Sequence, residues 1–551
     1  MKATEQMIIE ESPAATGDEL ADTGSATERL AGRLALAGLA LYCVFAPHSI
    51  AGAWIGLSCA ILGWLGRAVI TRRPFLLRRS ALDLPLWLLF GWSVLSSALS
   101  FEPRISLLKL ASVAAFLVCY VAQGLVTRRN AIWLAGLLVA SGVAGVLWSA
   151  GELARGRGVC VEEFAVTSPL RRLETPLMPG DCVWRVNRRR ISTVAEIDDA
   201  IRRAPDGSAL SFSVITRGEH VEWDGPLMNQ EMRSASSPSG ITRDGGPTHR
   251  FRASGWTRHY ETHAEVLQII AQLALGLALA HWQRRRLPDH RQQPPDSRQP
   301  TDSPPAPSAR RRQLVPFLAG AGFTLLAVGV AFTAMRTTLV ALACGAAVVA
   351  WRAVAAGGGQ AKESARQMNK ARLAVAVAVA LVLAFGAFAV WRTRPDGALR
   401  FGDFSSQLRW QVARTAAARV PLRPLVGHGM DASKYHWREW GFEGPIIHTH
   451  STPIQLAFER GLPALAFWLW LAARFWLLVT RAERGWRASA DAGTHGLLLG
   501  ATGAFAGFFL SSLVNYNLGD AEVALLVWWL MGMVVSVSGQ QAGSSVEPGN
   551  V

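Results

Sequence analysis

Apolar residues in this chain gather in long blocks separated by polar stretches, rather than in short amphipathic stripes. A helix needs about 20 consecutive apolar residues to cross a bilayer core. By that criterion the pattern predicts an all-α polytopic membrane protein with about 12 transmembrane helices. The expected spans are residues 31–47, 50–66, 83–99, 106–126, 131–149, 264–282, 314–334, 337–353, 372–391, 461–480, 495–514 and 521–538.

The polar stretches divide these spans into groups. Residues 1–30 show no succession of basic residues, short apolar run and cleavage site, so we expect a disordered cytoplasmic N-terminus and a retained first span. Residues 283–313 are rich in Pro, Gln, Ser and Arg, which predicts a disordered linker. The expected organisation is spans 1–5 in 31–150, an insertion at 151–262, span 6 in 263–282, spans 7–9 in 314–391, a loop at 392–460, spans 10–12 in 461–540 and a tail at 541–551.

The formal charge of +16 would suit a nucleic-acid-binding protein, but half of the residues are hydrophobic and only 17% are charged. The basic residues also concentrate in alternate loops, for example Arg284 to Arg286 after the sixth span and Arg481, Arg484 and Arg487 after the tenth. Loops rich in Lys and Arg stay on the cytoplasmic side. We therefore expect no nucleic-acid partner, two cytoplasmic termini, and an outward-facing position for both 151–262 and 392–460.

The insertion at 151–262 has the pattern of a small α+β domain. Alternating apolar runs at 182–186 and 210–215 bracket a helical pattern at 194–203. Residues 156–225 resemble a bacterial PDZ domain, in the stretches Ser168-Pro169-Leu170, Met178-Pro179-Gly180-Asp181-Cys182 and Ile191 to Ile201, although Arg188 replaces a usual glycine. That resemblance implies a peptide or protein partner bound by β-augmentation near Ser168, Leu170, Gly180 and Asp181. The alternative is a generic insertion that spaces or covers the membrane site.

Six cysteines are present, and only Cys160 and Cys182 fall together in an outward-facing segment. Such a segment permits a disulfide between them, which the sequence alone does not establish.

Candidate chemistry begins with arginines at the outward ends of spans. Arg336 lies between two apolar runs, where a guanidinium needs an anionic partner such as a phosphate, or else extends to lipid headgroups. Arg409 and Arg414 share an amphipathic stretch with Trp410, and Gly427-His428-Gly429 follows it. Trp410 and Trp437 could stack on sugar rings or anchor at the interface.

Polar residues gather directly before the tenth span, in His448-Thr449-His450-Ser451-Thr452 and on to Gln455, Glu459 and Gly461. An imidazole titrates near neutral pH, so His450 and His448 are candidate bases for a hydroxyl nucleophile. The alternative for His450 is a cap on the helix expected to begin near Thr452. The chain shows no matching ligand cluster nearby, so no metal site is predicted.

Together these motifs resemble the O-antigen ligase and O-antigen polymerase superfamily of bacterial membrane glycosyltransferases. The resemblance covers residues 314–538 and includes Thr333 to Arg336, Leu408-Arg409-Trp410 through Gly429, the segment from His450 to Pro463, and Asn515. Ser451 stands where that family commonly has asparagine. The resemblance implies a GT-C-like helical fold in the bacterial inner membrane, with the active site facing the periplasm.

The resemblance also implies an activity. It predicts a metal-independent, inverting transfer of glycan from an undecaprenyl-pyrophosphate donor to a hydroxyl of lipid A core, polysaccharide or protein, with no cofactor. His450, Arg336 and Arg409 would be catalytic, and Arg414, His428, His448, Trp410, Trp437 and Gln455 would bind substrate. The partners would be the lipid-linked donor, the acceptor and membrane lipids.

Two other classes stay open from the sequence. A solute transporter would also have about twelve spans, but internal repeats and broken helices with midplane polar residues are not evident. A membrane protease with a PDZ-like domain would need a pattern such as H-E-x-x-H, which the chain lacks.

Overall fold

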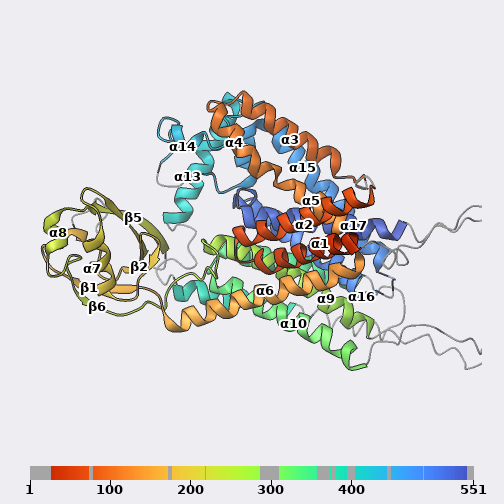
Figure 1. Cartoon of the computed structure of the whole chain (residues 1–551), viewed down its shortest axis with the longest axis horizontal. Coiled ribbons are helices and arrows are strands. Elements are labelled where there is room, and N and C mark those ends of the chain that lie inside the picture. The colour runs from red at the N-terminus through yellow and green to blue at the C-terminus, as the bar shows by residue number, and fades with distance from the viewer. Residues whose placement is uncertain are drawn as a thin grey trace, which may run out of the picture.

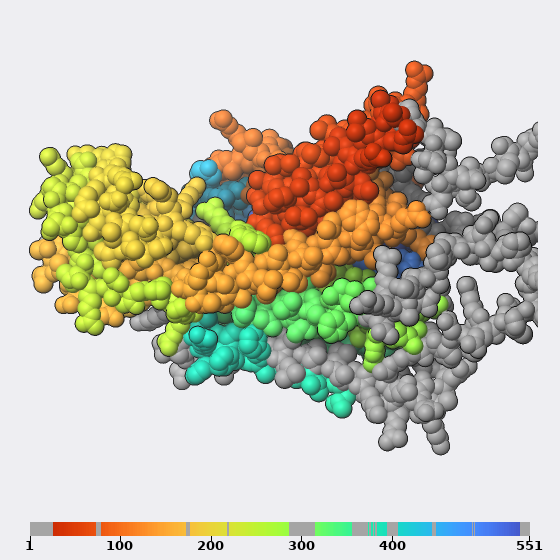
Figure 2. Space-filling model, turned by 60° about the horizontal axis from the view of Figure 1, so that its bottom comes forward, coloured from red at the N-terminus to blue at the C-terminus, as the bar shows by residue number. Residues whose placement is uncertain are grey.

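The computed structural model describes residues 26–72, 79–171, 177–216, 219–285, 309–355, 383–393, 404–443, 448–487 and 491–542, and single residues between them. A bundle of helices forms most of the molecule, and a sheet-containing unit projects from one end of it (Figure 1). Helix α6 (Arg128–Arg155) runs along the bundle into this unit, as the orange and yellow segments of Figure 2 show. Segment 404–443 lies at the same end (Figure 1), in agreement with the expectation that it shares a face with the insertion.

The helical part follows the predicted apolar blocks closely. Among the described residues, nine helical segments are long and apolar enough to cross a membrane, and each corresponds to one predicted span. Two further predicted spans are helical but do not reach that length and apolarity, and the twelfth, 372–391, falls partly outside the described residues. The helices are α1 (Ala26–Phe45), α2 (Ile50–Thr71), α3 (Asp83–Ala98), α4 (Pro103–Val113), η2 (Ala114–Leu117), α5 (Val118–Leu125), α6, α9 (Tyr260–Arg284), α10 (Ala309–Phe332), α11 (Arg336–Ala355), α13 (Phe404–Arg419), η4 (Val420–Leu422), α14 (Ser433–His436), α15 (Thr452–Trp486), α16 (Ala492–Ser512), η5 (Asn517–Gly519) and α17 (Ala521–Ala542).

Helices α9 and α16 form the centre of the bundle and lie unusually close. A Cβ placed on Gly276 would overlap the backbone of Gly500, and one placed on Gly496 would meet the backbone of Leu277. Small residues spaced four apart let membrane helices approach until their backbones touch. This contact fixes α9, whose first turns carry carboxylates of the site described below.

The insertion contains the predicted strand, helix and strand. They are β2 (Cys182–Val186), α7 (Val194–Arg203) and β4 (Ala209–Thr216), and Thr193 with Glu196 forms a capping box at the start of α7. The other elements are β1 (Val159–Phe164), η3 (Pro169–Arg171), β3 (Arg189–Arg190), β5 (Glu219–Leu227), α8 (Gln230–Ser234) and β6 (Ile241–Asp244). The strands form an antiparallel sheet in the order β5-β4-β2-β1-β6, with β3 paired to β2. Cys160 and Cys182 lie opposite each other on β1 and β2 and form a disulfide.

The four residues expected to bind a peptide do not line a free strand edge. Ser168 and Leu170 are buried, and Ser168 donates a hydrogen bond to the Ser239 carbonyl. Asp181 is buried and accepts the backbone N–H of Met178, while Gly180 takes the positive φ of the same turn. β1 is paired on both sides, by β2 and β6, and the unpaired edges among the described strands are those of β5, β6 and the short β3. The peptide site expected at these four residues therefore stays a prediction, and the sheet alone does not establish a PDZ fold.

Helix α15 is broken near its start, at Gly461, where φ is +81°. The break frees backbone groups that the loop 424–429 then satisfies. The amides of His428 and Gly429 donate to the carbonyls of Phe458 and Glu459 at 2.9 and 2.8 Å, and Leu462 donates to the Pro424 carbonyl at 2.7 Å. A kink inside a membrane helix persists when neighbouring groups pair with the freed backbone. The Gly-His-Gly motif therefore docks on the kink of α15.

This docking gives a first testable prediction. Gly427 has a positive φ, and its Cβ would overlap the backbone of Glu459 and Arg460. We expect Gly427→Ala to lower the free energy of unfolding by about 1–3 kcal/mol beyond the cost of the positive φ itself. The matched control is Gly441→Ala, since Gly441 has a similar φ but nothing within 4 Å of its Cβ position. Thermal unfolding of both variants in detergent measures the difference, and equal losses would contradict a close backbone contact at 427.

Candidate functional site

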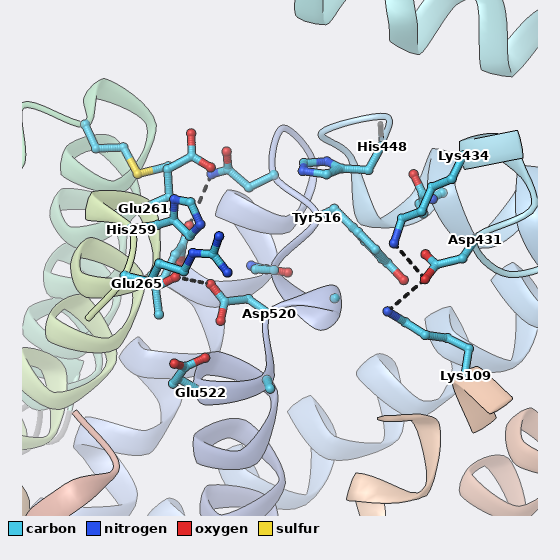
Figure 3. Close-up of a pocket in the computed structure, with 18 residues that line it drawn as sticks. Lys109, His259, Glu261, Glu265, Asp431, Lys434, His448, Tyr516, Asp520 and Glu522 are labelled. Carbon is cyan, nitrogen blue, oxygen red and sulfur yellow. Dashed lines mark hydrogen bonds and ion pairs between the residues drawn. The ribbon is translucent and has the colours of Figure 1, made fainter. Parts of the chain in front are cut away.

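A cavity of about 490 Å³ (Figure 3) is lined in part by residues at the start of α9, directly after the insertion in the chain. Its size falls within the range of small-molecule sites. Its walls come from α4, the start of α9, the α10–α11 turn, α14, the loop before α15 and the loop between α16 and α17. The lining residues are Lys109, Arg258, His259, Glu261, Thr262, Glu265, Met335, Asp431, Lys434, His448, Gln455, Asn515, Tyr516, Asn517, Gly519, Asp520, Ala521 and Glu522.

The loop that carries His448 and His450 is held in place by side chains of α15, the helix that follows it. Gln455 accepts the backbone N–H of Thr449 at 2.8 Å and donates to Glu459 at 2.8 Å, and both side chains are buried. Ser451 caps α15 by accepting the Ile454 N–H, so the cap is a serine and His450 is left for another role. His448 and His450 face each other with ring centroids 4.2 Å apart, and His448 lines the cavity. His450 has a φ of +50°, an uncommon conformation for a non-glycine residue.

The two arginines predicted to be catalytic are linked through helix α13, which contains Arg409 and is contacted by Arg336. Arg336 is the first residue of α11 and donates to the Ser406 hydroxyl at 3.2 Å. Arg409 lies three residues after Ser406 and donates to Glu261 at 2.5 Å. Residues three apart on a helix share one face, so the two guanidinium groups approach the same side of α13. Glu261 belongs to the first turn of α9 and lines the cavity beside His448.

Burial and charge set the protonation of the histidines. Burial, and after it the nearby Arg409 and His448 side chains, lowers the pKa of His450 from 6.5 to about 3, against the opposing effect of Glu261. Burial also lowers the pKa of His448. Each imidazole is therefore neutral at neutral pH and can accept a proton.

Other predicted substrate-binding residues lie away from the cavity. Arg414 and Trp410 are exposed on α13, and the Trp410 side chain is 71% exposed. Trp437 stacks on Phe442 with centroids 4.2 Å apart. His428 is buried between aromatic rings, 4.7 Å from Phe458, and packs the loop 424–429 rather than facing the cavity. Of the residues predicted to bind substrate, His448 and Gln455 line it.

Several residues that line the cavity were not predicted from the sequence. Lys109 and Lys434 both contact Asp431, at 3.1 and 2.9 Å, from different elements (Figure 3). Glu261 and Glu265 lie one turn apart near the start of α9, a helix apolar enough to cross a membrane, and carboxylates in such a segment are a signal of a functional site. That signal was present in the expected span 264–282 and in the residues just before it.

The fold and the site together define a polytopic membrane protein in which charged and polar side chains line a cavity at one end of the helix bundle. In comparison with known families, residues 321–469 match the O-antigen ligase family. No individual curated protein matches the chain. The matched segment contains Arg336, Arg409, His448 and His450, and it supports an O-antigen ligase type of enzyme, whereas the transporter and protease readings are not favoured.

Proposed function

We propose that this protein transfers a glycan from a polyprenyl-pyrophosphate donor to an acceptor hydroxyl at the outer face of the bacterial inner membrane. The observation that carries the proposal is an arrangement within the segment that matches the O-antigen ligase family. Arg336 contacts α13, which carries Arg409, and a neutral His450 lies near Arg409 and against His448, which lines the cavity. The basic loops at the other end of the spans support an outward-facing site.

The arginines suit the leaving group. As the bond between the anomeric carbon and the pyrophosphate oxygen breaks, negative charge accumulates on the pyrophosphate. Arg336 also lies at the first position of α11, where the positive end of the helix dipole makes a cation unfavourable and an anion favourable. A pyrophosphate bound there would satisfy both the guanidinium and the helix end. The two arginines would thus stabilise the charge without a metal.

His450 suits the acceptor. It would orient the hydroxyl and take its proton while the oxygen bonds to the anomeric carbon, opposite the departing pyrophosphate, with inversion. A pKa near 3 makes the free imidazole a weak base. The bound pyrophosphate would raise that pKa by adding negative charge nearby, and Glu261 would stabilise the imidazolium that forms.

This assignment makes a pH prediction. Because the pKa of His450 is lowered, the imidazole keeps its neutral, proton-accepting form as pH falls below 6.5. We expect kcat/KM for glycan transfer, which reports the free enzyme, to show no loss attributable to a histidine between pH 7 and 5. The check is initial rates at low donor concentration across that range. An acid limb centred near 6.5 would contradict a buried base beside Arg409.

The deciding experiment for the activity is mass spectrometry of glycolipid, polysaccharide and glycoprotein fractions from cells with and without the gene. Loss of one glycosylated product, together with accumulation of lipid-linked glycan, is the expected result. Unchanged glycans with altered solute uptake would overturn the proposal. The fraction that changes also identifies the acceptor.

A further inference from the structure

One end of the cavity is formed by four side chains that the proposed transfer step does not use. Glu265 extends from α9, Asn515 follows α16, and Asp520 and Glu522 flank the start of α17. We call these four residues the carboxyl wall. Figure 3 shows its three carboxylates on the side of the cavity opposite Lys109, Lys434 and Asp431.

Two acceptor atoms of the wall are buried without a hydrogen-bond partner among the described residues. One oxygen of Glu265 accepts from Ser511, Asn515 and Thr338, but its Oε2 has no donor. Asn515 donates from Nδ2 to Glu265, Thr337 and Ser511, which fixes the orientation of its amide, and its Oδ1 has no donor. Glu265 is 2% exposed and Asn515 is 5% exposed. A buried acceptor left unpaired costs about 1–3 kcal/mol, so both oxygens favour a ligand with hydroxyl donors.

The carboxyl wall differs from the rest of the cavity in that its carboxylates have no ion-pair partner among the described residues. Arg409 neutralises Glu261, and Lys109 with Lys434 neutralises Asp431. In the part of the chain that the structure describes, no ion pair neutralises Asp520, Glu522 or Glu265, although the exposed Arg258 also lines the cavity.

Asp520 also accepts the hydroxyl of Thr262. Burial, and next the charge of Glu522, raises the pKa of Asp520 well above its usual range, so it can offer a proton as well as accept one. The wall therefore combines acceptors and one donor in surroundings that repel anions.

We infer that the carboxyl wall is a binding subsite for the hydroxyl groups of a neutral sugar ring. The inference rests on the proposed function, because it assigns one part of a glycan substrate to this cavity. An anionic sugar would be repelled here, while the pyrophosphate end of a donor would be drawn to Arg336 and Arg409. The two ends of a lipid-linked glycan would thus be separated by charge.

The test measures binding without requiring turnover. Full-length protein in lipid nanodiscs is titrated with methyl glucopyranoside and, in parallel, with the negatively charged methyl glucuronide, and binding is followed by saturation-transfer difference NMR. We expect the neutral glycoside to bind at least fivefold more tightly than the glucuronide. Asp520→Ala and Glu265→Gln should each weaken glucoside binding about fivefold, the effect of one lost hydrogen bond. Addition of EDTA should change nothing, and loss of signal with EDTA would overturn direct binding by the wall.

The matched control is Lys434→Gln at the opposite end of the same cavity, which should leave glucoside binding unchanged. Equal binding of both glycosides, or unchanged binding in Asp520→Ala and Glu522→Gln, would overturn the subsite. If Glu265→Gln fails to fold, as judged by its melting temperature, the less buried Asp520 and Glu522 variants decide the question. Intact glycan transfer without selective glucoside binding would contradict the subsite but not the proposed activity. Selective glucoside binding without any transfer from a lipid-linked donor would contradict the proposed activity but not the subsite.

Discussion

Replacing His450 by alanine should reduce glycan transfer by about 10²–10⁴-fold, the usual contribution of a positioned general base. The neutral imidazole lies beside His448, with Glu261 and Arg409 close enough to influence its pKa, and helix capping is already performed by Ser451. The measurement is the transfer rate from a lipid-linked donor by purified protein, normalised to the amount folded in the membrane.

The backbone at His450 requires a second variant. Its φ of +50° would cost alanine about 1–2 kcal/mol of strain, whereas asparagine tolerates this conformation better. His450→Asn should therefore fold normally and still lose transfer. Activity retained in the asparagine variant but lost in the alanine variant would assign the effect to strain. Retained turnover in both would remove His450 from the chemistry.

Most of the bundle could be predicted because spanning helices are specified locally, by about 20 apolar residues each. Nine predicted spans have counterparts, and β2, α7 and β4 match the predicted runs at 182–186, 194–203 and 210–215. The break at Gly461 was not predicted, because it depends on a loop some 35 residues earlier that supplies partners for the freed backbone. The disulfide likewise required the register that places Cys160 opposite Cys182.

The candidate site was likewise predicted only in part. The arginines and histidines could be identified from their position at span ends, but their partners could not, since Glu261 lies 148 residues from Arg409. His428 resembled a ligand residue between two glycines. The structure shows instead that Gly427 admits the backbone of α15 and that Gly429 lies against the side chains of Ser100 and Ser106. Glu265 and Asn515 meet only after α9, α11 and α16 have packed. Long-range contacts of this kind leave no periodic trace in a sequence.

Replacing Arg336 by lysine should recover little activity, with transfer about 10²–10³-fold below the wild-type rate, as for loss of one donor to a developing anion. Lysine keeps the charge but loses the planar fork that contacts two phosphate oxygens at once. It would also lose the geometry of the contact with Ser406 on α13. The measurement is kcat at saturating donor, since the charge on the pyrophosphate grows toward the transition state. Arg414→Lys on the exposed side of α13 is the matched control and should keep near wild-type activity. Full activity in Arg336→Lys would mean that the residue serves as an interfacial anchor, because either cation can extend to lipid headgroups.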